Sequence, residues 1–153
     1  QLVFTIEEEW SLEGSDETFP QGALLSFDYQ NWLDTGEADV ETVFIAGERE
    51  SIGGVGATAS ALLVQIDANV VGGLSAFTRG EDGWTREEVE TPGNMTLGLT
   101  GTSPDHDVAF LNAEGFLTPD SLYRVNVAER TVSPLKSTPQ DSTIVFRPGT
   151  MWW

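Results

Sequence analysis

The chain of 153 residues carries 25 Asp and Glu against 7 Lys and Arg, a formal net charge of −18. Such a charge repels phosphate backbones and anionic lipid, so nucleic acid and membrane surfaces are poor partners. The absence of cysteine excludes disulfides, thiolate metal sites and a Cys nucleophile, and a hydrophobic content of 39% excludes a disordered acidic tail.

The first third of the chain predicts short strands. Runs of β-formers bounded by Gly, Pro, Asp and Asn are typical of strands, and we expect them at residues 3–9, 23–27 and 42–45. Only residues 29–34, Tyr-Gln-Asn-Trp-Leu-Asp, fit a turn of helix. Three glutamates at 7–9 begin a series of dispersed carboxylates, which indicates a solvated acidic coat.

The middle third predicts strands at residues 51–58, 62–67, 73–79 and 84–90. The Gly-rich stretches 53–60 and 70–73 have no following helix, so they do not fit a phosphate cradle. We expect their small residues to let an innermost strand crowd a central axis. The sequence Gly-Glu-Asp-Gly at 80–83 fits a hairpin turn better than a calcium loop, since no Asp-x-Asp-x-Asp-Gly pattern is present.

The last third predicts strands at residues 96–101, 108–112, 122–127, 131–135 and 143–146. His106, the only histidine, lies between two aspartates in a predicted turn. The bulky pair Phe116-Leu117 precedes the turn sequence Thr-Pro-Asp at 118–120.

A degenerate repeat distinguishes among all-β architectures. Leu-led strands with a nearby aromatic residue start at residues 24, 74 and 122. This spacing is close to the roughly 40 to 50 residues of a propeller blade, and it favours a propeller over a sandwich or a closed barrel. We therefore predict an all-β fold of about three antiparallel blades of an incomplete β-propeller, with blades at residues 1–47, 48–92 and 93–139.

The repeat also predicts which residues lie between the blades. The bulky pairs before the third strand of each blade should be buried there; these are Phe19-Pro20, Val70-Val71 and Phe116-Leu117. Closed propellers have roughly four to eight blades, so we expect either a segment of a longer polypeptide or copies that associate through open blade edges. The strand pattern at residues 2–6 has no innermost strand before it, which favours the segment.

Several motifs, in this order, resemble the later propeller blades of bacterial prolyl oligopeptidase-family serine peptidases. They are GALL-x-x-D at 22–28, LL-x-x-x-x-x-NV-x-G-x-L at 62–74, and F-LTP-x-x-LY at 116–123 followed by LKS-x-P at 135–139. The resemblance covers residues 2–139 and implies a seven-bladed propeller that caps an α/β-hydrolase domain, with the last of these blades leading back to the hydrolase. Residues 140–153 depart from the family pattern, and their role is not assigned.

No catalytic, cofactor-binding or metal-binding residue is predicted in this chain, and no cofactor. The serines at 51, 60, 75, 103, 121 and 142 do not stand in the Gly-x-Ser-x-Gly elbow that carries the family's nucleophile. A single histidine, His106, offers little for a Ser-His-Asp mechanism. The abundant carboxylates leave a glycoside-hydrolase pair open, because sequence spacing does not report distance in space.

The predicted function is a non-catalytic propeller segment of a prolyl oligopeptidase-like serine peptidase. By resemblance, the intact propeller would restrict access to the hydrolase domain, and peptide would be a substrate only of the intact parent. The predicted partners are the missing blades and the hydrolase domain, or further copies of this chain. No signal peptide or membrane span is visible, which leaves cytoplasm and periplasm open.

The alternative is a self-contained secreted β module that binds carbohydrate or protein through an acidic surface bearing tryptophans. The five tryptophans are Trp10, Trp32, Trp84, Trp152 and Trp153. Packing at strand ends or between blades is the favoured interpretation of the first three.

Overall fold

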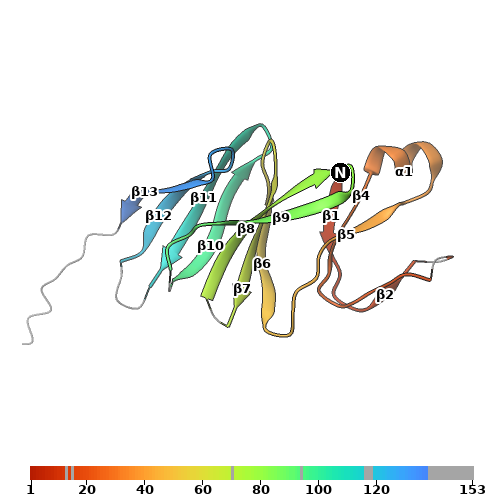
Figure 1. Cartoon of the computed structure of the whole chain (residues 1–153), viewed down its shortest axis with the longest axis horizontal. Coiled ribbons are helices and arrows are strands. Elements are labelled where there is room, and N and C mark those ends of the chain that lie inside the picture. The colour runs from red at the N-terminus through yellow and green to blue at the C-terminus, as the bar shows by residue number, and fades with distance from the viewer. Residues whose placement is uncertain (13, 15, 70, 94, 116–118, 138–153) are drawn as a thin grey trace, which may run out of the picture.

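The computed structural model describes residues 1–12, 14, 16–69, 71–93, 95–115 and 119–137, and three antiparallel sheets follow one another along this part of the chain (Figure 1). The first sheet has the order β1-β4-β5, with β1 at Leu2–Thr5, β4 at Leu24–Phe27 and β5 at Val40–Phe44. All its pairings are antiparallel.

The second and third sheets are four-stranded meanders. The second runs β6 (Glu50–Ala57), β7 (Leu62–Ala68), β8 (Val71–Gly80) and β9 (Gly83–Val89). The third runs β10 (Thr96–Ser103), β11 (His106–Glu114), β12 (Ser121–Asn126) and β13 (Thr131–Ser137). The predicted all-β fold with open, incomplete blades is confirmed.

Two segments are inserted between the strands of the first sheet. A small hairpin pairs β2 (Trp10–Ser11) with β3 (Thr18–Phe19), and the helix α1 (Tyr29–Thr35) connects β4 to β5. The Asp28 carboxylate caps α1 by accepting hydrogen bonds from the backbone N–H groups of Gln30 and Asn31. Gly36 ends the helix in the left-handed conformation, with φ of 78°.

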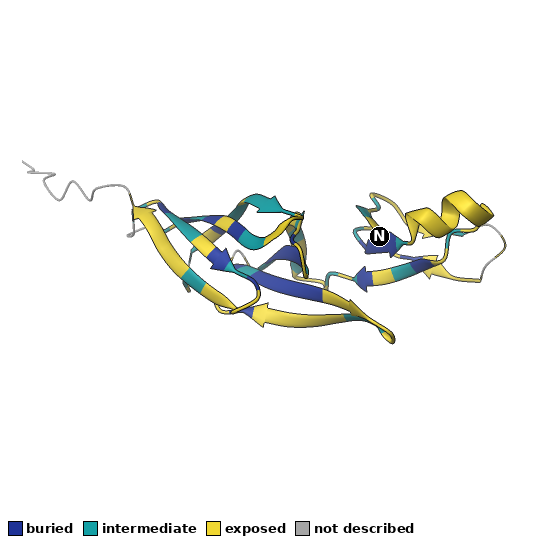
Figure 2. Cartoon of the chain, turned by 90° about the horizontal axis from the view of Figure 1, so that it is seen from above, coloured by how far each residue is buried: buried dark blue, intermediate teal, exposed yellow. Residues whose placement is uncertain are grey.

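Two of the three core clusters lie between neighbouring sheets. One cluster joins Leu63 and Leu74 of the second sheet to Leu111 and Val125 of the third. Another joins Leu24 and Val43 of the first sheet to residues of the second, including Val64 and Phe77. Figure 2 shows that exposed residues dominate α1 and the outer strand β13, whereas buried segments lie on the inner parts of the sheets. Burial between neighbouring sheets is the packing expected of propeller blades.

The hairpin predicted at residues 80–83 is confirmed, since Gly80 and Gly83 pair across the β8–β9 turn and Gly83 has φ of 103°. The strand predicted at 3–9 is wrong beyond Thr5. Three consecutive exposed glutamates follow there, and the chain turns away into the β2–β3 hairpin. That hairpin carries no alternating apolar pattern and was missed.

The predicted burial of bulky pairs between blades is wrong for Pro20 and Val71. Pro20 is exposed, and Val71 is 46% exposed. Phe19 is buried, but it packs with Leu25 and Val40 on the face of the first sheet that carries the β2–β3 hairpin. Val70, Phe116, Leu117, the predicted strand 143–146 and the whole segment 140–153 lie outside the described residues. The division into blades at 1–47, 48–92 and 93–139 stays a prediction.

Among the residues that the structure describes, no helix is long and apolar enough to cross a membrane.

Candidate functional site: the seams between sheets and their inner strands

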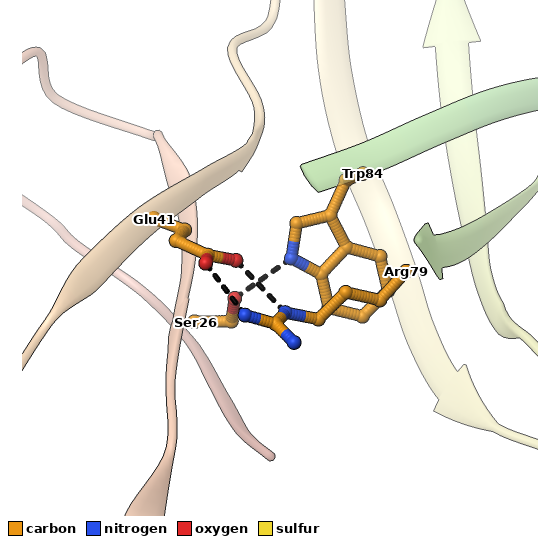
Figure 3. Close-up of polar contacts among 4 residues, drawn as sticks. All are labelled: Ser26, Glu41, Arg79 and Trp84. Atoms are coloured by element: carbon orange, nitrogen blue, oxygen red, sulfur yellow. Dashed lines mark hydrogen bonds and ion pairs between the residues drawn. The ribbon is translucent and has the colours of Figure 1, made fainter. Parts of the chain in front are cut away.

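We call the contact between the first and second sheets the first seam. Two polar interactions stabilise it (Figure 3). Arg79 on β8 donates two hydrogen bonds to the Glu41 carboxylate on β5, with N–O distances of 2.9 and 2.6 Å. Trp84 on β9 donates its indole N–H to the Ser26 hydroxyl on β4 at 2.9 Å, and Ser26 is fully buried. Both interactions therefore join segments that are far apart in the sequence.

The fork geometry of Arg79 explains the electrostatics of this seam. A guanidinium that donates two hydrogen bonds to one carboxylate favours its ionised form. The hydrogen bond from Arg79 lowers the pKa of Glu41 below its ordinary value, and the same bond raises the pKa of Arg79. Glu41 therefore stays ionised, and the pair stays intact, to a more acidic pH than an unpaired glutamate would allow.

Aromatic contacts complete the first seam. The rings of Phe44 on β5 and Phe77 on β8 lie 5.8 Å apart between centroids. The guanidinium carbon of Arg86 on β9 lies 5.1 Å from the centroid of the Phe44 ring, a cation–π arrangement. Arg86 also donates its Nε–H to the hydroxyl of buried Ser75 at 3.1 Å. Four of the first seam's interactions thus come from β8 and β9.

The second seam, between the second and third sheets, depends on close backbone approach. A Cβ placed on Gly72 of β8 would lie 2.8 Å from the backbone nitrogen of Leu97 on β10, and one placed on Gly56 of β6 would lie 2.5 Å from the Thr102 methyl group. A side chain at either position would force the sheets apart. Both glycines lie in the Gly-rich stretches, but Gly72 is on β8 and not on an innermost strand, so the predicted crowding of a central axis stays a prediction.

Gln65 links the same two sheets through polar atoms. This residue on β7 is buried, and its side-chain oxygen accepts a hydrogen bond from the backbone N–H of Leu99 at 3.1 Å. Its amide nitrogen donates to the carboxylate of Asp67 at 3.2 Å. An ion pair between Arg130, directly before β13, and Glu87 on β9 joins the same two sheets near their outer strands. The buried amide is satisfied on both of its ends, as a stable interior position requires.

The inner strands β6 and β10 are the neutral part of an acidic molecule. From Ser51 to Ala57 and from Thr96 to Ser103 neither strand contains a charged residue. They lie side by side, with the Cβ position of Gly54 only 3.5 Å from the Leu99 Cβ atom. Apart from Glu50 at the start of β6, a surface built from these strands offers uncharged side chains and backbone groups, with no charge to hold an ionic ligand.

The residues considered for chemistry do not assemble into a catalytic group. His106 is the exposed first residue of β11, and within the described residues nothing hydrogen-bonds its imidazole. Its neighbour Asp107 accepts instead from the backbone N–H of Ser60 at 2.8 Å. No group of three or more His, Asp or Glu residues in the described ranges could hold a metal ion.

The described tryptophans divide into two kinds. Trp84 lies in the first seam, in agreement with the packing interpretation. Trp10 and Trp32 are 36% and 41% exposed, and they belong to the hairpin and to α1. Trp10 stacks on Phe19 with centroids 5.7 Å apart, and Trp32 contacts Phe27 and Tyr29.

Sequence reasoning missed the Arg79–Glu41 and Trp84–Ser26 pairs altogether. The one signal that could have drawn attention to Arg79 is the scarcity of basic residues, since the first 48 residues contain twelve Asp and Glu and no Lys or Arg. Each of the few basic residues in so acidic a chain is a natural partner for a carboxylate, although no local pattern selects Arg79 for Glu41.

Comparisons with known proteins agree with this architecture. Residues 5–138 match the family model for the prolyl oligopeptidase N-terminal β-propeller domain. The uncharacterized peptidase y4nA of Sinorhizobium fredii is 30% identical over 141 residues, which cover 91% of this chain and 19% of that protein.

Two solved structures share the fold. The post-proline cleaving enzyme from Rickettsia typhi matches with a TM-score of 0.73 and 16% identity, over 88% of this chain and 20% of that one. A chain from a structural study of two prolyl endopeptidases matches with a TM-score of 0.54 and 16% identity, over 65% of this chain and 14% of that one. The chain thus spans a fifth or less of the length of each of these proteins.

Proposed function

The chain belongs to the prolyl oligopeptidase N-terminal β-propeller family, and from this premise we propose that it forms part of a wall that restricts access to a separate α/β-hydrolase domain. The observation that carries the proposal is the stacking of successive sheets with their inner strands in contact, at Gly54–Leu99 and Gly56–Thr102. In a propeller, sheets stacked in this way surround a central channel. The channel would open toward the domain that the propeller covers.

The wall acts by shape rather than by binding. The second seam is too close for a side chain at Gly72, so its sheets are held at a fixed separation. Apart from Glu50 at the start of β6, the inner strands carry no charge that would retain a peptide. A passage bordered by such strands lets an extended peptide pass and stops a folded domain, because only the former is narrow enough. The substrate of the intact parent would be a peptide.

The reacting groups would lie in another part of the parent polypeptide. Gly-x-Ser-x-Gly does not occur in these 153 residues, and the sequence has one histidine. The chain alone should therefore not hydrolyse a chromogenic proline-containing peptide. Turnover that a serine-reactive reagent abolishes would contradict the assignment of the chemistry to a separate domain.

A graft tests the proposed restriction of access. Residues 2–137 replace the matching segment of the Sinorhizobium fredii relative, and cleavage of a short chromogenic peptide is compared with cleavage of a folded protein bearing the same sequence in a loop. We expect the graft to keep the preference of the unmodified relative for the short substrate. Gly72→Ala in the graft should reduce that preference, while Gly98→Ala, at an open position, should not. Equal cleavage of both substrates by a correctly folded graft would refute the proposal.

One observation favours a second candidate, a carbohydrate-binding or protein-binding module. Trp10 on the β2–β3 hairpin and Trp32 on α1 are partly exposed in the acidic first part of the chain, where sugar rings could stack. A glycan screen with the chain and with Trp32→Ala distinguishes the two functions. Binding that depends on Trp32 would favour the module, and absence of binding would favour the wall.

A further inference from the structure

We propose that a cavity on the second sheet, beside the first seam, binds a short peptide through both of its charged termini. Arg86 would hold the carboxylate of the peptide, and Glu50 and Glu90 would surround its ammonium group. The cavity has a volume of about 510 Å³ and is lined by residues of β7, β8 and β9 together with these two glutamates. Small-molecule sites commonly have volumes of roughly 300–1,000 Å³. The inference goes beyond the proposed function, because the cavity lies on the face of the second sheet that is directed at the first sheet.

The guanidinium of Arg86 is held in place by the protein itself. Its Nε–H donates to the hydroxyl of Ser75 at 3.1 Å, and Ser75 is only 2% exposed. The guanidinium carbon lies 5.1 Å from the centroid of the Phe44 ring, on the other side of the first seam. A side chain that is already ordered loses little further freedom when it binds a ligand, so a contact to its remaining N–H groups costs little entropy.

The remaining N–H groups of Arg86 form an open fork. Arg79, on the neighbouring strand, donates to both oxygens of Glu41 at 2.9 and 2.6 Å. The Nη2 atom of Arg86, in contrast, lies 3.9 Å from the Glu88 carboxylate, which is beyond hydrogen-bonding distance. Among the described residues no carboxylate therefore accepts from the fork of Arg86, although the chain contains 25 Asp and Glu. A fork of this kind suits a carboxylate that comes from a ligand.

The floor between the charged groups is apolar and open. Two neighbouring cross-strand pairs of β7 and β8 form it, Ile66 with Gly73 and Ala68 with Val71. Val71 is 46% exposed, so the first sheet leaves this part of the second sheet uncovered. From Val71 to Ser75, which holds the guanidinium, β8 rises about 13 Å. Three extended residues span at most about 11 Å, so a tripeptide with an apolar side chain fits on this floor.

The charges around the cavity favour a ligand that carries both signs. Arg86 is its one basic lining residue, whereas Glu50, Glu88 and Glu90 are acidic. The glutamates would repel a simple anion, and Arg86 would repel a simple cation. Glu50 accepts a hydrogen bond from the backbone N–H of Gly47 through one oxygen at 3.0 Å, and its other oxygen can accept from an ammonium group. A peptide with uncapped termini brings the two opposite charges at the two ends of one short chain.

An NMR titration of the isotope-labelled whole chain tests the proposal, with the tripeptide Ala-Leu-Ala as the probe. We expect chemical-shift changes at the backbone amides of Val71, Gly73 and Arg86 that saturate at millimolar peptide, with little change at Thr131 on β13. Acetylation of the peptide removes its ammonium charge, and amidation removes its carboxylate. Each change should weaken binding by about ten-fold or more, because it leaves one charged group of the site without its partner. These capped peptides test the site without any variant of the protein.

Arg86→Lys keeps the positive charge but cannot donate two parallel hydrogen bonds, so it should weaken binding of the uncapped peptide by about ten-fold. Arg79→Lys is the matched control, because Arg79 lies in the same seam and does not line the cavity. It should leave binding unchanged. Equal binding of capped and uncapped peptides, equal losses in the two variants, or unchanged shifts at Gly73 in millimolar peptide would each overturn the proposal. The titration involves no hydrolase domain, so failure of the graft would leave its result standing.

Discussion

Replacing Gly72 by alanine probes the separation of the second and third sheets directly. The new Cβ would lie 2.8 Å from the Leu97 backbone nitrogen and 3.0 Å from its Cβ atom. A backbone atom does not rotate away, so β10 must move or the sheets must separate. Overpacking of this kind costs about 1–3 kcal/mol. Replacing glycine also lowers the conformational entropy of the unfolded chain, which stabilises the folded state by about 0.4–1 kcal/mol. We therefore expect the free energy of unfolding to fall by about 1–2 kcal/mol, as the difference between these two effects.

Urea unfolding, followed by tryptophan fluorescence, measures this change against a matched control. Gly98→Ala removes a glycine from the partner strand β10, but its nearest heavy atom is the Asn112 Cβ at 4.0 Å, an ordinary contact. The control should leave stability unchanged or raise it by a few tenths of a kcal/mol, as ~0.4 kcal/mol is the lower end of the entropic effect. If Gly72→Ala proved as stable as Gly98→Ala, the close approach of β8 and β10 would be refuted.

Three further outcomes are expected. Trp84→Phe should lower the free energy of unfolding by about 1–2 kcal/mol in urea titrations, since it leaves the buried Ser26 hydroxyl without its donor. Trp32→Phe, at an exposed position, should have little effect on the free energy of unfolding, and equal losses in the two variants would contradict this. Arg79 lowers the pKa of Glu41 from its ordinary 4.5, so the stability that Glu41 adds is present above that value and lost as the pH falls through the lowered pKa. Glu41→Gln should remove this part of the pH dependence, and unfolding curves from pH 3 to 7 that coincide for both proteins would count against it. The chain alone should release no chromophore from a proline-containing peptide, and a serine-reagent-sensitive rate would contradict this.

The periodic part of the fold was predictable because strand signals are local. The runs at 62–67, 73–79 and 84–90 differ from β7, β8 and β9 by only a few residues at either end. Their alternation, their turns and their spacing are properties of short windows of sequence. The helix at α1 was also visible, since its aromatic and polar residues do not alternate.

The seams were not predictable, because they join residues that no local pattern connects. Arg79 and Glu41 are 38 positions apart, and Trp84 and Ser26 are 58 apart. The Phe19 and Val71 predictions failed for the same reason, since apolar character indicates burial but does not identify the surface that covers a residue. Phe19, on the β2–β3 hairpin, is covered by Leu25 and Val40 of the first sheet, and Val71 stays 46% exposed.

A disulfide between the inner strands tests most directly whether these sheets stack as blades around an axis. The chain has no cysteine, so Gly54→Cys with Leu99→Cys introduces the only thiols, at Cβ positions 3.5 Å apart. That separation suits a disulfide. Mild oxidation should give an intramolecular link, seen by mass spectrometry as the loss of two hydrogens, whereas Gly54→Cys with Phe110→Cys should stay reduced. Failure of the first pair to link in folded protein, or equal linking of both pairs, would contradict the propeller arrangement.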